Sequence, residues 1–294
     1  MRRIILSLAL SALATSAATA GTLTPIFTQV TAVSNFPAAT ERDRGPISAF
    51  VDATTSPSTA KADLTSGTIR TYTENNEFFT SHGMAGQLFV RFEYSGAPVT
   101  VPQDAFTMST TAALLRDLGS GVGPEVGITT VNTSFFVNDL GTLRTVDVRT
   151  VREPVFDADN NIIGFTDNVD VPRNNSTSFG PDTVRSETIG AANVSITFGS
   201  TAFVLEDGDT FEVQASFEGS QSSGMGLGSG GSMIVDSRST AQLGFVLPAG
   251  VSLVTQPGEN FSWVQGQTTV IPLPAGAWLL LAGLGALGAL RRRG

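Results

Sequence analysis

Cysteine is absent from the 294-residue chain, so disulfide bonds, thiolate metal sites and thiol catalysis are all excluded. Histidine occurs once, at His82, and a conventional zinc site is therefore not expected. Lysine also occurs once, and tryptophan and tyrosine occur twice each. With no cross-links available, the fold must depend on its hydrophobic core alone.

Basic residues are few, with 17 Lys and Arg against 26 Asp and Glu and a net charge of -9. Five arginines lie in the two terminal segments described below, and without these segments the count becomes 12 against 26, or about -14. Such a surface repels nucleic acid and anionic lipid through its long-range field. We therefore expect no nucleic-acid partner. The polar surface must consist mainly of Thr, Ser, Asn, Asp and Arg, which is typical of extracellular proteins.

The C-terminal segment 270–294 carries the most informative motif. An apolar run from Ala275 to Leu290 is followed by Arg291, Arg292 and Arg293. These sixteen apolar residues would span roughly 24 Å as a helix, slightly less than the bilayer core of about 30 Å. We expect a short transmembrane helix with a cytoplasmic stop. The residues before and at its start, which the prolines keep extended, are Ile271, Pro272, Leu273, Pro274, Ala275 and Gly276.

This order of motif, apolar helix and arginine cluster resembles the VPLPA-CTERM variant of the PEP-CTERM sorting signals of Gram-negative bacteria. The resemblance covers about 24 residues and departs from the family pattern at Ile271, where the family has valine. It implies that an exosortase, a membrane transpeptidase-like protease, removes the tail. The protein would then be released or transferred to the cell surface or the exopolysaccharide. A generic C-terminal membrane anchor is the alternative.

The N-terminus has the features of a secretory signal peptide. Arg2 and Arg3 precede an apolar stretch, and Ala18 and Ala20 are small residues at the positions that signal peptidase reads. We expect a signal helix over residues 1–20, cleaved after Ala20, and export through the inner membrane. The mature protein would then reside in the cell envelope, at the cell surface or in the extracellular matrix. A buried N-terminal helix is the weaker alternative.

The intervening body, residues 21–256, shows the period of two that is typical of strands with one wet face. Turn-forming residues separate the alternating segments. We therefore predict an all-β fold, an antiparallel β-sandwich of jelly-roll-like or similar type, as one domain or two sub-domains. The alternating segments are 87–94, 142–151, 176–189, 194–198, 211–217, 241–247 and 251–255.

Four segments interrupt this pattern. Residues 112–118 predict a short helix, because Ala and Leu dominate before Gly119. Residues 219–232 are mostly Gly and Ser and predict a mobile loop. Residues 32–65 have few large apolar side chains and suggest an irregular excursion. Residues 257–269, which include Trp263, are interpreted as a linker between the body and the membrane.

Catalytic and metal-binding motifs are weak. We expect His82 in a loop or turn, and no Gly-x-Ser-x-Gly elbow supports a serine hydrolase. Asp157, Asp159 and Asn161 have the one-three-five spacing of a calcium loop. An EF-hand is not matched, however, because Ile162 and Asn168 stand where Gly and Glu are needed. The tip of a β-hairpin is the better interpretation, with calcium as a weak candidate.

The function classes follow from these observations. A pair of carboxylates could serve a glycosidase, but the chain has few of the Trp and Tyr residues that line sugar clefts, and its 19 Phe predict core packing. We expect a structural or adhesive protein of the surface or exopolysaccharide matrix, without a cofactor and not an enzyme. The first alternative is a carbohydrate- or calcium-binding surface module, which a shallow acidic or aromatic groove on a sheet face would favour. A secreted hydrolase is the second.

Overall fold

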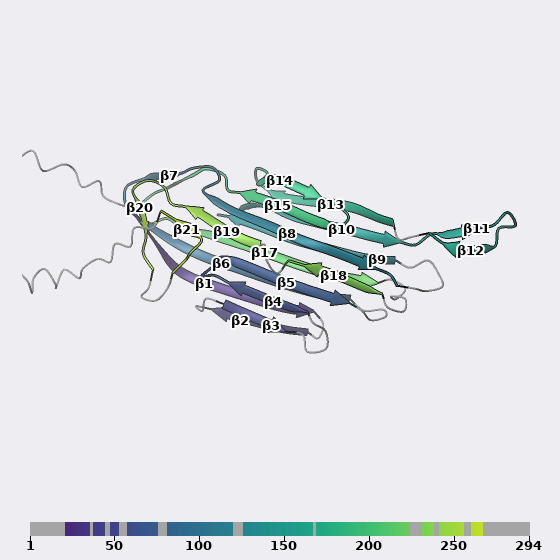
Figure 1. The fold of residues 1–294 in the computed structure, drawn as a ribbon. Coiled ribbons are helices and arrows are strands. Elements are labelled where there is room, and N and C mark those ends of the chain that lie inside the picture. The colour runs from purple at the N-terminus through teal and green to yellow at the C-terminus, as the bar shows by residue number, and fades with distance from the viewer. Residues whose placement is uncertain are drawn as a thin grey trace, which may run out of the picture.

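The computed structural model describes residues 21–35, 38–44, 48–52, 58–75, 81–119, 126–166, 169–223, 231–237, 241–255 and 260–266. This part of the chain is all-β and contains no helix (Figure 1). Accordingly, the described residues include no helix long and apolar enough to cross a membrane. The predicted signal peptide with Ala18 and Ala20, the motif 271–276 and the tail arginines 291–293 all lie outside the described residues.

The first of two large sheets has eight strands. Seven follow the order β13-β10-β9-β17-β6-β1-β2, and β20 pairs with the start of β1. The bounds are β1 (Gly21–Asn35), β2 (Ala38–Arg44), β6 (Ser81–Ser95), β9 (Val126–Val137), β10 (Leu140–Val151), β13 (Val169–Phe179), β17 (Thr210–Ser223) and β20 (Val251–Leu253).

The second large sheet has nine strands in the order β14-β15-β8-β18-β5-β19-β21, with β4 beside β5 and β3 beside β4. The bounds are β3 (Ser48–Asp52), β4 (Thr59–Asp63), β5 (Thr68–Asn75), β8 (Phe106–Asp117), β14 (Val184–Ile189), β15 (Asn193–Gly199), β18 (Ser232–Asp236), β19 (Ala241–Val246) and β21 (Val264–Gln265).

Two small ribbons complete the described chain. The strands β7 (Val99–Val101) and β16 (Phe203–Leu205) form one, and β11 (Pro154–Phe156) and β12 (Ile162–Phe165) form the other. All described pairs are antiparallel except β1–β20 and β19–β21, which are short and parallel. The antiparallel arrangement predicted from the alternating segments is therefore confirmed for most of the chain.

The core lies between the two large sheets, and aromatic rings fill much of it. The alternation in β6 buries Leu88, Val90 and Phe92, each at most 1% exposed. The Phe92 ring of β6 lies 6.4 Å from the Phe245 ring of β19 in the other sheet. Burial of these apolar surfaces provides the main driving force for folding. Two curled sheets around one core are consistent with a β-sandwich.

The predicted helix at residues 112–118 is wrong, because β8 continues to Asp117. Side chains there alternate between the two sides of the strand: Ala112 and Leu114 are buried, whereas Leu115 is 55% exposed. β8 pairs with β15 on one side and with β18 on the other. These ladder hydrogen bonds override the modest helix preference of Ala and Leu.

The predicted irregular segments also contain strands. Residues 219–223 are the end of β17, and residues 32–65 contain the end of β1 with β2, β3 and β4. Small side chains permit close approach here: a Cβ at Gly219 would lie 2.7 Å from Cγ1 of Val235. The same logic applies in β4, where Ala60 and Ala62 are fully buried. Scarcity of large side chains therefore signalled tight packing between strands, which the loop interpretation missed.

Residues 260–266 are packed on the body, so the interpretation of this stretch as a linker is wrong. Trp263 is 3% exposed, and its indole Nε1 donates a hydrogen bond to the Leu64 carbonyl at 2.8 Å. The backbone N–H of Phe245 donates to the Trp263 carbonyl at 2.9 Å. β21 then extends the second sheet beside β19. The segment is a closing element of the fold.

The two ends of the described chain lie at the same end of the body, and the β11–β12 hairpin projects from the opposite end (Figure 1). Gly21 pairs with Val251 at the start of β1, and β21 pairs with the last residues of β19. We call the end with Gly21 and Gly266 the terminal pole and the end with the hairpin the distal pole. The chain thus enters and leaves the body from one side.

Candidate functional site

A hollow of about 540 Å³ lies on the outer face of the first sheet and crosses five of its strands, from β1 to β10. A smaller hollow of about 240 Å³ adjoins it and shares Gln87. We call the two together the outer groove. The residues that line it are Phe27, Gln29, Thr31, Val33, Ala85, Gly86, Gln87, Phe89, Arg91, Asn132, Leu143, Thr145, Ser216, Phe217 and Glu218.

Strand register places hydroxyl and amide side chains in a row across the floor of the groove. Thr31 of β1 lies opposite Gln87 of β6, and Gln87 lies opposite Ser216 of β17. Ser216 in turn lies opposite Ser134 of β9, and their hydroxyl oxygens are 2.6 Å apart. Adjacent strands are about 4.8 Å apart. The floor is therefore a continuous polar row about three strand spacings long.

The next row of the floor contains the groove's acidic residue. Glu218 of β17 lies opposite Asn132 of β9, which lies opposite Thr145 of β10. The Asn132 amide donates to Oε2 of Glu218 at 3.4 Å. Glu218 is the only charged residue among the described residues that line the larger hollow. In the smaller hollow, Arg91 is neutralised by an ion pair with Glu212.

Two pairs of phenylalanine rings lie beside the polar floor on one side, and Phe27 and Phe89 line the smaller hollow. Phe27 and Phe89 meet edge to face at 5.7 Å, and Phe136 and Phe179 meet at 5.9 Å with tilted planes. Phe89 and Phe136 stand on strands that are separated by β17, so their backbones are about 10 Å apart. Gly141 makes room for the second pair, because a Cβ there would lie 2.5 Å from Cδ1 of Phe136.

The hydroxyl of Thr31, on the floor of the groove, is a buried polar group. Thr31 is 4% exposed, and its Oγ1 has no hydrogen-bond partner among the described residues. A buried polar group without a partner costs about 1–3 kcal/mol, so such groups are rare and call for an explanation. A ligand hydroxyl or a water molecule in the groove would supply the missing partner.

His82 does not belong to the groove. It lies in β6 rather than in the predicted loop or turn, so that prediction is wrong. Its side chain is 2% exposed and follows the inward alternation of Met84 and Leu88 on the same strand. Among the described residues, the groove lining has a single carboxylate, that of Glu218.

The calcium candidates Asp157, Asp159 and Asn161 lie at the tip of the β11–β12 hairpin, and the hairpin prediction is confirmed. Oδ1 of Asp157 accepts the backbone N–H groups of Asp159 and Asn161 at 2.9 and 2.8 Å. The bonds from Asn161 and Asp159 hold the pKa of Asp157 below its ordinary value of 3.8. The described residues include no group of three His, Asp or Glu side chains that could hold a metal ion. Turn formation thus accounts for the spacing.

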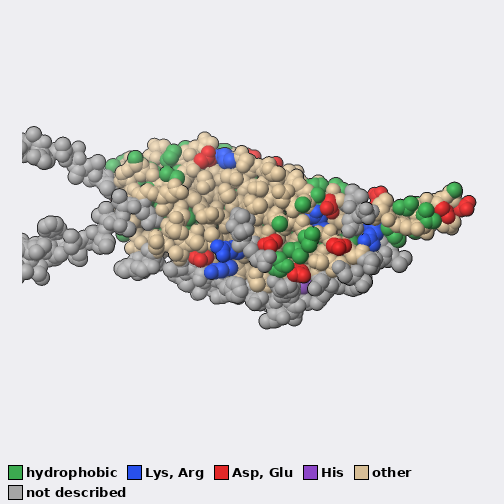
Figure 2. Space-filling model, viewed as in Figure 1, with side chains coloured by type: hydrophobic (Ala, Val, Ile, Leu, Met, Phe, Trp, Pro, Cys, Tyr) green, Lys and Arg blue, Asp and Glu red, His purple; other side chains and the backbone are tan. Residues whose placement is uncertain are grey.

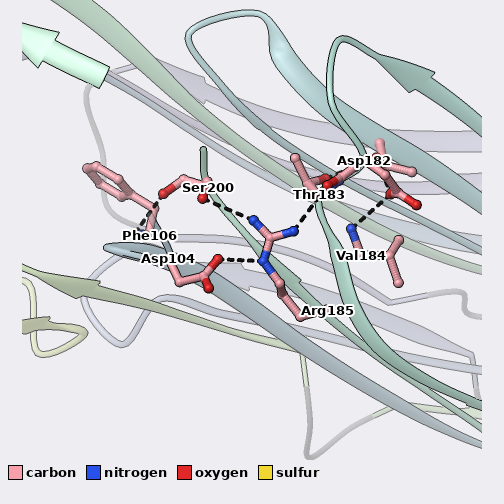
Figure 3. A network of polar contacts seen from close by, with 8 residues as sticks. Asp104, Phe106, Asp182, Thr183, Val184, Arg185 and Ser200 are labelled. Atoms are coloured by element: carbon pink, nitrogen blue, oxygen red, sulfur yellow. Dashed lines mark hydrogen bonds and ion pairs between the residues drawn. The ribbon is translucent and has the colours of Figure 1, made fainter. Parts of the chain in front are cut away.

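A second polar cluster near the terminal pole is structural (Figure 3). Arg185 of β14 donates through Nε to Asp104 at 2.6 Å, and through Nη1 and Nη2 to the carbonyls of Asp182 and Ser200 at 3.0 and 3.2 Å. Ser200 Oγ accepts the backbone N–H of Phe106 at 3.2 Å. Each guanidinium nitrogen of Arg185 has an acceptor, so the cluster ties these segments together.

Comparison with known proteins adds no family. No protein-family model matches the chain, and no curated protein or solved structure matches it either. The fold and the groove therefore define the protein only as an all-β chain with a polar groove on one sheet and a phenylalanine pair in part of its lining.

Sequence reasoning did not find the groove residues. Gln87, Ser216 and Glu218 occupy the wet positions of alternating strands, so they read as ordinary solvent-facing side chains. One feature of the sequence pointed to the groove. At the solvent-facing positions of residues 81–95 and 126–137, amide, hydroxyl and Phe side chains outnumber charged ones.

Proposed function

We propose that the protein is an exported, adhesive protein of the cell surface or extracellular matrix that holds a saccharide chain in the outer groove. The observation that carries this proposal is the groove itself, with its hydroxyl and amide floor, the Phe27–Phe89 pair in its lining, and the buried Thr31 hydroxyl, which has no partner among the described residues. Concave sites with apolar walls and a few placed polar groups are typical of ligand binding.

The lining chemistry suits a sugar chain better than other ligands. Sugar rings present apolar C–H faces, which phenylalanine rings can cover, and hydroxyl groups, which Gln, Asn and Ser bind as donors or acceptors. Among the described residues that line the larger hollow, the one charged side chain is Glu218. Its carboxylate attracts positive charge and repels negative charge, so chains that contain amino sugars are favoured at this position.

Export and sorting remain part of the same proposal, and the terminal sequence motifs support them. We infer that signal peptidase removes residues 1–20 and that an exosortase-type enzyme acts at 271–276 after the C-terminal helix has held the chain in the membrane. The finer fold description, a jelly-roll-like sandwich, is likewise a proposal. Because β21, the last described strand, lies at the terminal pole (Figure 1), a C-terminal attachment would leave the groove and the distal pole accessible.

Processing can be tested on the protein recovered from the native envelope and culture medium. Intact mass and terminal sequencing are expected to find a chain that begins near Gly21 and ends within residues 271–275. Arginine is costly inside a membrane, so the uncut tail would stay in the inner membrane. A mature chain that still ends at Gly294 would contradict exosortase-type sorting and indicate a simple tail anchor.

Saccharide binding can be tested with a glycan array, followed by titration calorimetry with the strongest hit. Gln87→Ala is expected to weaken binding about tenfold, because the ligand loses hydrogen bonds at the centre of the floor. Phe89→Ala should weaken it by a similar factor through the loss of ring contact.

Gln242→Ala is the matched control, because Gln242 is an exposed glutamine on β19 of the second sheet. Its affinity should equal that of the unaltered protein. If no glycan binds saturably, or if Gln87→Ala and Gln242→Ala have equal effects, the groove is not a saccharide site and a purely structural role is left.

A further inference from the structure

The larger hollow of the outer groove is much longer than it is wide. On each of the strands that it crosses, the lining residues lie within three consecutive positions, such as 85–87 on β6 and 216–218 on β17. Two steps along a strand cover about 7 Å, whereas the strand spacings from β1 to β10 add up to about 19 Å. The long axis of the groove therefore crosses the strands. A narrow, elongated site fits a linear chain better than a single sugar.

The polar floor lies between two rows of different chemistry. Two residues along the strands in one direction, Phe89 of β6 lies opposite Gln214 of β17, which lies opposite Phe136 of β9. Two residues in the other direction lies the row of Glu218 and Asn132 described above. Phenylalanine rings thus recur along one side of the floor, and polar groups line the other. Sugar rings have apolar C–H faces and polar hydroxyl edges, which these two sides can contact separately.

The rows continue beyond the hollow onto β13, at the edge of the first sheet. Thr145 of β10 lies opposite Asn175 of β13, which is exposed. Phe179 of β13 is 54% exposed and packs on Phe136 at 5.9 Å. In the described part of the chain, no strand of this sheet follows β13 on that side. A chain longer than the hollow can therefore pass over β13 and continue into solvent.

We propose that the outer groove binds an internal stretch of a linear polysaccharide that contains amino sugars, with the chain laid across the strands from β1 to β13. This inference rests on the saccharide site proposed above and adds the direction, length and charge of the ligand. About four sugar units fill the hollow, because an extended chain of pyranose rings advances by roughly one strand spacing per ring. Further units reach Phe179, and Glu218 meets an ammonium group of the chain.

Chain length is the first test, by titration calorimetry of the mature chain with glucosamine oligomers from the monomer to the hexamer. The affinity should rise at least about tenfold from the monomer to the tetramer, because each added ring fills another part of the hollow. The hexamer should bind about threefold tighter than the tetramer, because its additional rings reach β13.

Phe179→Ala separates the hollow from its extension over β13. This substitution should abolish the extra affinity of the hexamer and leave the affinity of the tetramer unchanged, because the tetramer ends before β13. Val171→Ala is the matched control. Val171 lies on the same strand and is 43% exposed, but it lies opposite Arg149, outside the rows of the groove. Its loss should change neither affinity.

Glu218→Gln tests the charge of the ligand. It should weaken binding of the glucosamine tetramer about fivefold and reduce its dependence on salt, because one attraction between opposite charges is lost. The affinity for the uncharged N-acetylglucosamine tetramer should stay the same. Asp159→Asn is the control, because Asp159 is exposed at the tip of the β11–β12 hairpin. Figure 2 shows this hairpin projecting from the body with hydrophobic and acidic side chains on its surface.

The outcomes distinguish this inference from the proposed function. If the monomer and the hexamer bind equally and Gln87→Ala still weakens both, the groove holds a single sugar, and the saccharide proposal survives without the linear chain. Equal effects of Glu218→Gln and Asp159→Asn, or binding of uncharged chains only, would overturn the amino-sugar assignment. If neither these oligomers nor any glycan of the array binds saturably, the proposed function and this inference both fail.

Discussion

Replacing Trp263 with alanine is expected to lower the free energy of unfolding by about 3–5 kcal/mol. The indole ring is buried against Gly67, where a Cβ would lie 2.6 Å from Cγ of the tryptophan. Loss of the ring leaves a cavity, and the Leu64 carbonyl loses its 2.8 Å hydrogen bond from Nε1. Urea unfolding of the mature chain, followed by far-ultraviolet circular dichroism, measures the change.

Two further substitutions distinguish the loss of ring packing at Trp263 from a general effect of any substitution in residues 260–266. Trp263→Phe keeps most of the apolar contact and removes the N–H donor, so we expect a loss of about 1–2 kcal/mol. Gln265→Ala changes an exposed side chain on the same strand, β21, and should cost less than about 0.5 kcal/mol. If Trp263→Ala costs no more than Gln265→Ala, residues 260–266 are a linker after all.

Strands with one wet face could be predicted from the sequence because their pattern is local. The alternation in 87–94 and 211–217 reports directly which side chains are buried, and Phe92, Phe211 and Phe217 are indeed at most 2% exposed. The hairpin tip at Asp157 was also predictable, because an Asx turn is formed by residues close together in the chain. Local interactions thus account for the successful predictions.

The wrong predictions concern segments whose structure depends on distant partners. Trp263 receives its place from Leu64, which is 199 positions earlier. Residues 112–117 are held in a strand by β15 and β18, both of which follow much later in the chain. A local propensity contains no information on such pairings. Ala and Leu therefore suggested a helix, and residues 257–269, which have only two aromatic residues, Phe261 and Trp263, suggested a linker.

The groove could not be predicted for a related reason. Its floor needs the register of five strands, from Thr31 on β1 to Thr145 on β10, and the sequence alone does not fix that register. Whether the Thr31 hydroxyl has a partner among the described residues can be judged only when its surroundings are known. The sorting and signal segments stay predictions, because they lie outside the described residues.

A buried ion pair joins the two large sheets at one edge. Arg116 of β8 donates through Nε and Nη2 to the two carboxylate oxygens of Asp170 on β13, at 3.1 and 2.8 Å. The Arg116 side chain is 2% exposed and the Asp170 side chain 28%. Nη1 of Arg116 also donates to Thr129, and the Thr150 hydroxyl donates to Asp170. The guanidinium thus depends on Asp170 for its counter-charge.

Asp170→Asn is expected to lower the free energy of unfolding by about 3 kcal/mol at neutral pH, because it leaves a buried guanidinium without an anion. Adding Arg116→Met should recover much of this loss, since the double variant has no buried charge at this position. The exposed pair Arg91–Glu212, with side chains 47% and 33% exposed, is the control. Glu212→Gln should lower the free energy of unfolding by less than about 1 kcal/mol. If Asp170→Asn lowers it no more than this, Asp170 is not the essential counter-charge of Arg116.

The unaltered protein and Asp170→Asn differ in free energy of unfolding, and the pH dependence of this difference follows from the protonation state of the Asp170 carboxyl. Partial burial raises its pKa, but hydrogen bonds from Arg116 and Thr150, together with the Arg116 charge, outweigh burial and hold the pKa below its ordinary value of 3.8. The stabilisation by Asp170 is therefore fully present above that value and is lost as the pH falls through the lower pKa of the folded state. We expect the free energies of unfolding of the unaltered protein and of Asp170→Asn, measured at a series of pH values, to differ by a constant amount from pH 7 to about 5. The two values should converge below about pH 4. A difference that is unchanged in acid would mean that the asparagine disturbs packing rather than charge.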